Sequence, residues 1–346
     1  MKKIARKDLG ALLNLIAESK KIYLPAKNGE QTNYAVYSRD TEVDLDTLKT
    51  VKSAKEVFFP QSETLYTVKK VDKKIRITQQ ELENEDFVLF GVRGCDVKGI
   101  EVLDRVFLSE PVDSFYSARR QHGIIVSLAC NEPEESCFCK VFGIDCAEPT
   151  ADVAIWTCGD SIFWKANTEK GEALTCECES LLADCDADDE KALAELKKKI
   201  GEITELLPYM NLSLEGWHGG ATNEKFSSEI WKDIYKPCLA CGTCTFVCPT
   251  CQCYDLKDYD TGSGVQRYRC WDSCMYSDFT MMAHGNNRTS QMQRFRQRFM
   301  HKLVYFPANN GGMYSCVGCG RCVDKCPAST NIVKVIKAFS KEVSSK

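Results

Sequence analysis

The first part of the chain switches between two spacings of apolar residues. DFVLFGV (86–92) and GIIVSLAC (123–130) are short apolar runs typical of buried strands, and DVKGIEVLDRVF (96–107) between them has helical apolar spacing. A strand, a helix and a second strand in this order predict a right-handed βαβ unit in a partly parallel sheet. VAIWTCGDSIFWKA (153–166) predicts a hairpin around its Gly-Asp pair. The pattern predicts an α/β domain over residues 1–207.

Three further segments of this region have amphipathic helical spacing. MKKIARKDLGALLNLIAESKK (1–21) predicts a helix rather than a signal peptide, because its apolar stretch is short and lacks a small-residue cleavage site. DLDTLKTVKSAKE (44–56) predicts a helix capped by Asp44 or Asp46. DDEKALAELKKKIGEITELL (188–207) predicts a longer helix, acidic first and basic later, as the helix dipole favours.

The apolar pattern weakens over YMNLSLEGWHGGATN (208–222), which predicts a linker. Beyond it, EKFSSEIWKDIY (224–235), NNRTSQMQRFRQRFMHKLVYF (286–306) and NIVKVIKAFSKEV (331–343) have helical spacing. We therefore expect a second, mostly α-helical domain over residues 223–346.

The overall composition is that of an ordinary globular protein. The 346 residues are 44% hydrophobic and 27% charged, which is enough for two cores. The net charge of -4 argues against nucleic-acid binding, and no apolar run approaches the roughly 20 residues of a membrane span. With no export signal, we expect a cytoplasmic protein.

Cysteine is the exception, with 21 residues. In a long chain without an export signal, cysteines at C-x2-C spacing indicate metal or redox binding rather than disulfides. CLACGTCTFVCP (238–249) and CVGCGRCVDKCP (316–327) both read C-x2-C-x2-C-x3-C-P. This spacing is typical of two-cluster ferredoxins, in which the fourth cysteine of each run binds the cluster of the other run.

The two runs therefore predict two [4Fe–4S] clusters with crossed ligands. Gly242, Gly318 and Gly320 allow tight turns around the sulfur atoms, and a proline ends each run. Zinc is the alternative, but zinc prefers two C-x2-C pairs. The predicted ligands are Cys238, Cys241, Cys244 and Cys326 for the first cluster and Cys316, Cys319, Cys322 and Cys248 for the second.

A second group of cysteines lies in the α/β region. Cys95 comes between a predicted strand and its helix and Cys130 ends the next strand, so parallel pairing puts both at one edge of the sheet. The helix N-terminus there favours a negatively charged cluster. Cys137 and Cys139 follow, with Cys146 nearby. We expect a third cluster on Cys95, Cys130, Cys137 and Cys139, with buried core thiols as the alternative.

The remaining cysteines give weaker signals. Cys251, Cys253 and Cys274 form an incomplete set, which would be a further metal site, a redox thiol pair or spare thiols beside the clusters. The cysteines in hairpin and loop patterns are not expected to bind metal; they are Cys158, Cys176, Cys178 and Cys185.

Basic residues are concentrated between the two cysteine runs. Because a four-thiolate cluster is anionic, cations near it raise its reduction potential, and the same surface could dock an acidic partner. A solvated helix face is the alternative. These residues are Arg267, Arg269, Arg288, Arg294, Arg296, Arg298 and Lys302. We expect His284 to be structural and Asp96 to cap its helix.

No motif for a substrate or a nucleotide accompanies the cysteines. No G-x-G-x-x-G follows a strand, and no P-loop or Ser-His-Asp pattern stands out. No catalytic residue is therefore expected.

The cysteine runs and the segments between them resemble a known family. CGTCTFVCPTCQCYD, RYRCWDSCM, AHG, RFRQRFMHK and CVGCGRCVDKCP occur in this order. They resemble the ferredoxin-like iron–sulfur subunit of anaerobic sulfite reductase, together with the related iron–sulfur β subunits of cytosolic NiFe sulfhydrogenases. RGCD, Cys130 and CFC extend the resemblance into the N-terminal region. Cys270 departs from the sulfite reductase pattern and is not expected to be a ligand.

The resemblance implies an electron-transfer subunit. Electrons would come from a flavin subunit that oxidises NAD(P)H and go to a catalytic partner, which is a siroheme sulfite reductase in one family and a NiFe hydrogenase in the other. We expect the sulfite reductase, with a NiFe hydrogenase or another flavin-linked oxidoreductase as the alternative. A thiol–disulfide enzyme and a structural zinc protein are further alternatives.

Overall fold

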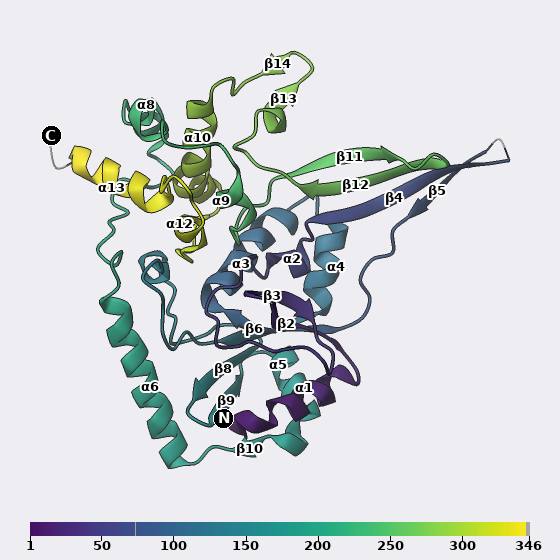
Figure 1. Ribbon diagram of the computed structural model, residues 1–346, viewed down its shortest axis with the longest axis vertical. Helices are drawn as coiled ribbons and strands as arrows, with labels where there is room; N and C mark the ends of the chain where they lie inside the picture. The colour runs from purple at the N-terminus through teal and green to yellow at the C-terminus, as the bar shows by residue number, and fades with distance from the viewer. Residues whose placement is uncertain (73, 344–346) are drawn as a thin grey trace.

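The computed structural model describes residues 1–72 and 74–343 (Figure 1). Its centre is an eight-stranded mixed sheet in the order β10-β1-β9-β8-β7-β6-β2-β3. The strands are β1 (Lys2–Ala5), β2 (Lys21–Asn28), β3 (Gln31–Val36), β6 (Phe87–Arg93), β7 (Gly123–Leu128), β8 (Val153–Cys158), β9 (Ser161–Ala166) and β10 (Ala183–Asp184).

The middle of this sheet is parallel, as the sequence predicts. β6 pairs in parallel with both β2 and β7, and β7 pairs in parallel with β8. Every residue of β6 and β7 is buried, which explains why both read as continuous apolar runs. Helices α3 (Gly94–Phe107) and α4 (Ser114–His122) connect them. The predicted hairpin is the antiparallel pair β8–β9.

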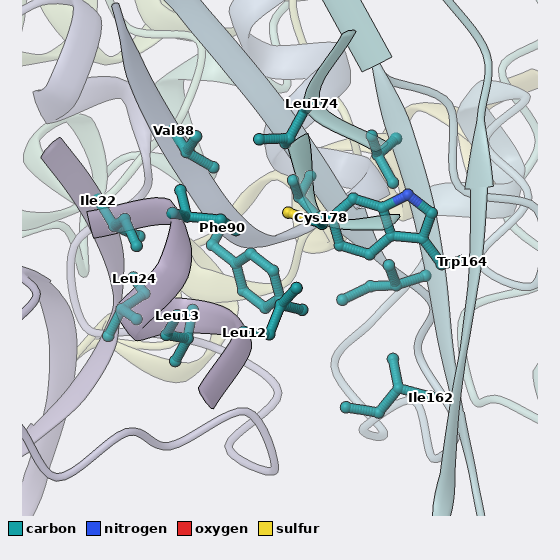
Figure 2. Close-up of a cluster of buried hydrophobic side chains, with 14 of the residues drawn as sticks. Leu12, Leu13, Ile22, Leu24, Val88, Phe90, Ile162, Trp164, Leu174 and Cys178 are labelled. Carbon is teal, nitrogen blue, oxygen red and sulfur yellow. The ribbon is translucent and has the colours of Figure 1, made fainter. Parts of the chain in front are cut away.

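One face of the sheet is covered by α1 (Leu9–Ala17) and α5 (Glu169–Glu177). Leu12 and Leu13 of α1 lie against Phe90 of β6 in a buried apolar cluster (Figure 2). Cys178 belongs to this cluster, so it is a buried core side chain.

The opposite face carries α2 (Lys55–Phe58), α3 and α4 in a second apolar cluster that includes Phe58, Leu103 and Tyr116. The long helix α6 (Ala187–Glu205) follows the sheet and leads toward the C-terminal region (Figure 1). Its N-terminus has the capping box of Asp186 and Asp189, so the predicted helix over this segment is confirmed.

Two helix predictions near the N-terminus need correction. Residues 44–54 form turns rather than a helix, and only α2 follows them. The backbone here bonds to the sheet instead, with Asp44 N–H donating to Pro25 O and Val51 N–H to Thr32 O. Tertiary hydrogen bonds therefore override the local helical spacing. The N-terminal segment begins with β1 before α1.

The C-terminal region is built mainly from helices around a separate core. Its helices are α7 (Thr222–Ser227), α8 (Trp231–Ile234), α9 (Thr243–Phe246), α10 (Gln291–Met300), a π-helix (His301–Tyr305), α11 (Phe306–Asn309), α12 (Arg321–Asp324) and α13 (Ile332–Val343). Trp231, Phe299 and Ile336 lie in this core. The predicted fold class, an α/β region followed by a mostly helical region, is confirmed, although 224–235 is two short helices rather than one.

A four-stranded antiparallel sheet projects from the body as an arm (Figure 1). Its order is β11-β12-β4-β5, formed by β4 (Ser62–Val71), β5 (Lys74–Gln79), β11 (Tyr254–Asp260) and β12 (Gly264–Trp271). The arm therefore combines strands from both predicted domains. A small hairpin, β13 (Met281–Met282) and β14 (Gly285–Asn286), follows. Within the described ranges, no helix has the length and apolar character needed to span a membrane.

Candidate metal centres

Cysteines from both runs line one hollow beside helices α9 and α12, which pack against each other. Cys248 comes from the first run, and Cys316, Cys319 and Cys322 come from the second. These are the four residues that the crossed pattern predicts for one cluster. Four thiols around one hollow fit a four-iron cluster, which takes four thiolate ligands.

The loop of the second run turns through two glycines with positive φ, +60° at Gly318 and +79° at Gly320. A Cβ on Gly320 would lie 2.6 Å from the carbonyl oxygen of Ser136, and a Cβ on Gly318 would overlap with the backbone of Phe138. These positions therefore need glycine both for the turn and for the close approach of a second chain segment. Gly242 in the first run also has a positive φ, +75°.

Two buried cations accompany these thiols. Lys302 Nζ donates to Cys248 Sγ at 3.4 Å, to Thr250 Oγ1 at 2.7 Å and to the Ser315 carbonyl at 2.9 Å. Burial lowers the pKa of Lys302, but the neighbouring Cys248 thiolate outweighs that effect and raises the pKa above its usual value, so the ammonium stays charged. Arg298 is also buried, and its Nε has no hydrogen-bond partner among the described residues. Both side chains offer positive charge to an anionic group in this hollow.

The first run forms a turn that leads into α9. Its cysteines Cys238 and Cys244 pack against the helical core, while Cys241 is exposed. Cys244 lies on α9, which packs against α12 with its Cys322, so this set lies beside the hollow of the second run. The local contact of Cys326 is the Thr330 N–H, which donates to its Sγ at 3.2 Å. The grouping of Cys326 with Cys238, Cys241 and Cys244 stays a prediction.

The N-terminal cysteines converge on a second hollow, at the carboxyl ends of β6 and β7. It is lined by Cys95, Cys130, Cys137 and Cys139, the four residues predicted for a third cluster. Cys146, which the prediction left outside the set, lines it too, and its Sγ lies 3.1 Å from Thr204 Oγ1. The sequence signal for Cys146 was its nearness to the C-x-C pair. Together with Cys319 of the second run, six thiols line this hollow, whereas a four-iron cluster takes four.

Burial sets the protonation of these thiols. It raises the pKa of Cys130, of Cys244 and of Cys316 to about 12 in each case. Such thiols become thiolates when a bound metal supplies the compensating charge. Among the described residues, no three His, Cys, Asp or Glu side chains are grouped closely enough to hold a single metal ion.

The two hollows share a wall. Cys319, which lines the hollow of the second run, also lines the N-terminal hollow, and so does Gly318. Phe138, which lies between the two cysteines of the C-x-C pair, donates its N–H to the Gly318 carbonyl at 2.9 Å. The segment that carries Cys137 and Cys139 is therefore bonded directly to the loop of the second run.

A buried ion pair strengthens this junction and corrects the role predicted for Asp96. Arg321 of α12 donates to both oxygens of Asp96 at 2.6 and 2.7 Å, and its Nε donates to the Thr50 carbonyl at 3.0 Å. Asp96 thus pairs with a guanidinium rather than capping α3, whose N-cap residue is Arg93. No local pattern indicates this pairing, since 225 positions separate the two residues.

Lys49 makes a second connection between the two regions. Its Nζ lies 2.7 Å from Glu134 and 2.5 Å from Asp324 of α12, and it lines the N-terminal hollow. Arg93, buried beside Cys130, donates to the Ala129 carbonyl at 2.6 Å. Neither cation was predicted to adjoin a metal site, because both lie outside the basic segment between the two cysteine runs.

The incomplete set of cysteines lies near the base of the arm. Cys251 contacts Cys248, and Cys253, just before β11, contacts Cys274. The buried Lys55 donates to the Cys251 carbonyl at 2.9 Å. Cys270 lies in β12. The predicted role of Cys251, Cys253 and Cys274 stays a prediction.

Most of the predicted basic residues serve other contacts. Arg269 pairs with Glu63 and Asp113, Arg267 lies 3.8 Å from Asp258, and Arg296 lies over the Phe226 ring at 3.5 Å. Arg294 donates to the carbonyl oxygens of Met275 and Arg288, within the helical region. His284, which was expected to be structural, is exposed between β13 and β14. Arg298 and Lys302 are thus the two of the seven that adjoin the cysteines of the runs.

Comparison with known proteins agrees with this geometry. Residues 237–330 match the family model of a 4Fe-4S dicluster domain. The chain is 32% identical over 325 residues to "Sulfhydrogenase 2 subunit beta" of Pyrococcus furiosus, and the match covers 93% of each chain. No solved structure matches. The chain therefore belongs to the family of sulfhydrogenase β subunits and is an iron–sulfur electron-transfer subunit.

Proposed function

We propose that this chain carries electrons through three [4Fe–4S] clusters between two partner subunits of an oxidoreductase complex. Each cluster, when bound, takes up and releases one electron at a time. The proposed ligands are the eight cysteines of the two runs in the crossed sets given above, and Cys95, Cys130, Cys137 and Cys139 for the third cluster.

The shared wall of the two hollows is the observation that supports a continuous path. Cys319 lines both hollows, and α9, which carries Cys244 of the first run, packs against α12, which carries Cys322 of the second. The order of sites would be the N-terminal hollow, then the second run with Cys248, then the first run with Cys326. The path would cross both regions of the molecule.

The side chains around the sites hold charge rather than react. Lys302 and Arg298 place positive charge beside thiolates, which favours the reduced state. Arg321 is neutralised by Asp96, so it fixes the position of the loop without adding net charge to the site. In this proposal no residue bonds to a substrate.

The partners we propose are a flavin subunit that oxidises NAD(P)H and a catalytic redox subunit. A NiFe hydrogenase is the favoured catalytic partner, because the relative named a sulfhydrogenase subunit matches 93% of the chain. A siroheme sulfite reductase remains the second candidate, supported by the order of motifs from residue 241 to residue 327. The complex would lie in the cytoplasm of an anaerobically growing cell.

Iron and acid-labile sulfide per chain, measured after anaerobic purification, test the number of clusters. About twelve of each are expected, and about eight would remove the third cluster. Cys130→Ser should lower twelve to about eight, whereas Cys178→Ser, in the apolar core, should leave the count unchanged. Near-zero iron in intact protein would contradict the entire proposal.

Purification of the complex by a tag on this chain tests the catalytic partner. A NiFe protein and hydrogen-dependent reduction of the clusters are expected. If a siroheme protein co-purifies and the complex reduces sulfite with NADH, the catalytic partner is a sulfite reductase and not a NiFe hydrogenase. In either complex, Cys244→Ser should abolish electron transfer, and full activity of that variant would contradict the path.

A further inference from the structure

The outer half of one face of the arm is apolar. In an antiparallel ladder, directly paired residues project from the same face. Ile77 pairs with Val68, and Val68 pairs with Val265, so these three form a row across three strands. Ile75 follows the same face at period two and pairs with Lys70 of β4. Nearer the body, Asp258 pairs with Arg267 on this face, and Leu256 pairs with Arg269.

The base of this face packs against the body, whereas its outer part is exposed to solvent. Trp271, at the inner end of β12, is buried and donates its indole N–H to the Phe59 carbonyl at 3.0 Å. Farther out, 75% of Ile75, 66% of Ile77 and 37% of Val265 are exposed. All residues of the edge strands β5 and β11 are exposed as well. The outer part of this face is therefore an exposed apolar patch beside the open edge of β5, which is typical of an interaction surface.

The outer end of the arm is positively charged. Lys69, Lys70, Lys74 and Arg76 lie on β4 and β5, with Asp72 in the turn between them. Among the side chains that the structure describes, those of residues 1–72 and 74–340, none of these four cations has a carboxylate oxygen within 4 Å. Their charge is therefore available to carboxylates of another molecule.

We propose that the apolar face and the basic end of the arm dock a different protein subunit, one that presents an apolar patch bordered by carboxylates. A second copy of this chain fits less well, because the carboxylates of β11 on its arm already have partners. Asp255 lies 3.8 Å from Lys257, Asp258 lies 3.8 Å from Arg267, and Asp260 accepts the Gly262 N–H at 2.8 Å. The arm lies outside the cysteine sites, so this proposal goes beyond electron transfer and can be tested independently of it.

A photocrosslinking residue tests the occupant of the face. In one variant, p-benzoylphenylalanine replaces Ile77. In the matched control it replaces Thr78, which points to the opposite, polar face of the arm. Each variant is studied in the complex purified by a tag on this chain. The Ile77 position should crosslink to another subunit, next to Asp or Glu residues, and the Thr78 position should not. Crosslinking only to a second copy of this chain, or none in the intact complex, would overturn the proposal.

Charge substitutions measure the energetic role of the face. Ile75→Asp combined with Ile77→Asp should raise the Kd for the crosslinked subunit at least about tenfold, since it places charge at the centre of the interface. Thr78→Asp should change that Kd little. Iron per chain and the EPR spectra of the reduced protein should be unchanged in both variants, which keeps this test distinct from that of the clusters. An unchanged Kd for the isoleucine variant would overturn the proposal.

Discussion

Arg321 and Asp96 form a bidentate ion pair at 2.6 and 2.7 Å, with 3% and 1% of their side chains exposed. Asp96 is adjacent to Cys95, and Arg321 lies between Cys319 and Cys322. The pair therefore fastens the edge of the N-terminal hollow to the loop of the second cysteine run.

Loss of one member of this pair should leave a buried charge without its partner. Asp96→Ala is expected to lower the free energy of unfolding by about 3–5 kcal/mol. The double variant Asp96→Leu with Arg321→Met should recover most of that loss, because it removes both charges. Anaerobic denaturation of the two variants measures the difference. A double variant as unstable as Asp96→Ala would show that the pair is not the cause.

The glycines of the second run should tolerate no side chain. Gly320→Ala puts a Cβ 2.6 Å from the Ser136 carbonyl oxygen at φ +79°. We expect a loss of at least about 2 kcal/mol of stability and a fall in iron per chain. Gly311→Ala is the matched control, because its φ is +61° but no atom lies within 4 Å of the added Cβ. Its iron content should equal that of the parent protein.

Removal of the buried ammonium should make reduction harder. Lys302→Met deletes one positive charge beside Cys248, while Thr250 still donates to the Ser315 carbonyl. The midpoint potential of the adjoining cluster should fall by about 50–100 mV, which corresponds to about 1–2 kcal/mol for one electron. Redox titration followed by EPR measures it. Arg296→Gln, whose guanidinium contacts Phe226 instead, should leave the potential in place.

His301 should make the protein sensitive to mild acid. Burial, with Lys302 and Arg288 nearby, lowers the pKa of His301 to about 4. The unfolded chain binds a proton near pH 6.5, so the stability contributed by neutral His301 is present above pH 6.5 and is lost as pH falls toward 4. His301→Gln should reduce the loss of stability between pH 7 and pH 5 by roughly 1–2 kcal/mol. Denaturation at both pH values measures this.

The surface histidine His122, beside Asp86 at 2.8 Å, provides the control for this experiment. His122→Gln should retain the acid sensitivity that His301 confers. If His301→Gln and the parent protein lose equal stability between the two pH values, the assignment to His301 is wrong.

The sequence was informative where the signal is local. The apolar runs at 86–92 and 123–130 predicted two central strands, because burial on both faces leaves no polar positions. The position of Cys95 and Cys130 at the ends of these strands then predicted their convergence, and both line the N-terminal hollow.

Contacts between segments that are far apart in the chain could not be predicted from the sequence. Arg321 and Asp96 meet only because two regions dock, and no pattern along the chain reports that contact. The helix predicted over 44–56 failed for a related reason: Arg93 donates to the Leu45 carbonyl at 2.6 Å, and the sheet takes the neighbouring backbone hydrogen bonds. The arm combines β4 with β12, whose pairing joins positions some 200 residues apart.

The shared wall of the two hollows has a consequence for biosynthesis. The thiols from Cys95 to Cys146 leave the ribosome well before Gly318 and Cys319, by roughly 10–30 s at usual rates of translation. Until then the N-terminal hollow lacks the side that these two residues provide. The third cluster that we propose would therefore enter a hollow that is still open in the nascent chain, and the last part of the protein to be made would close it.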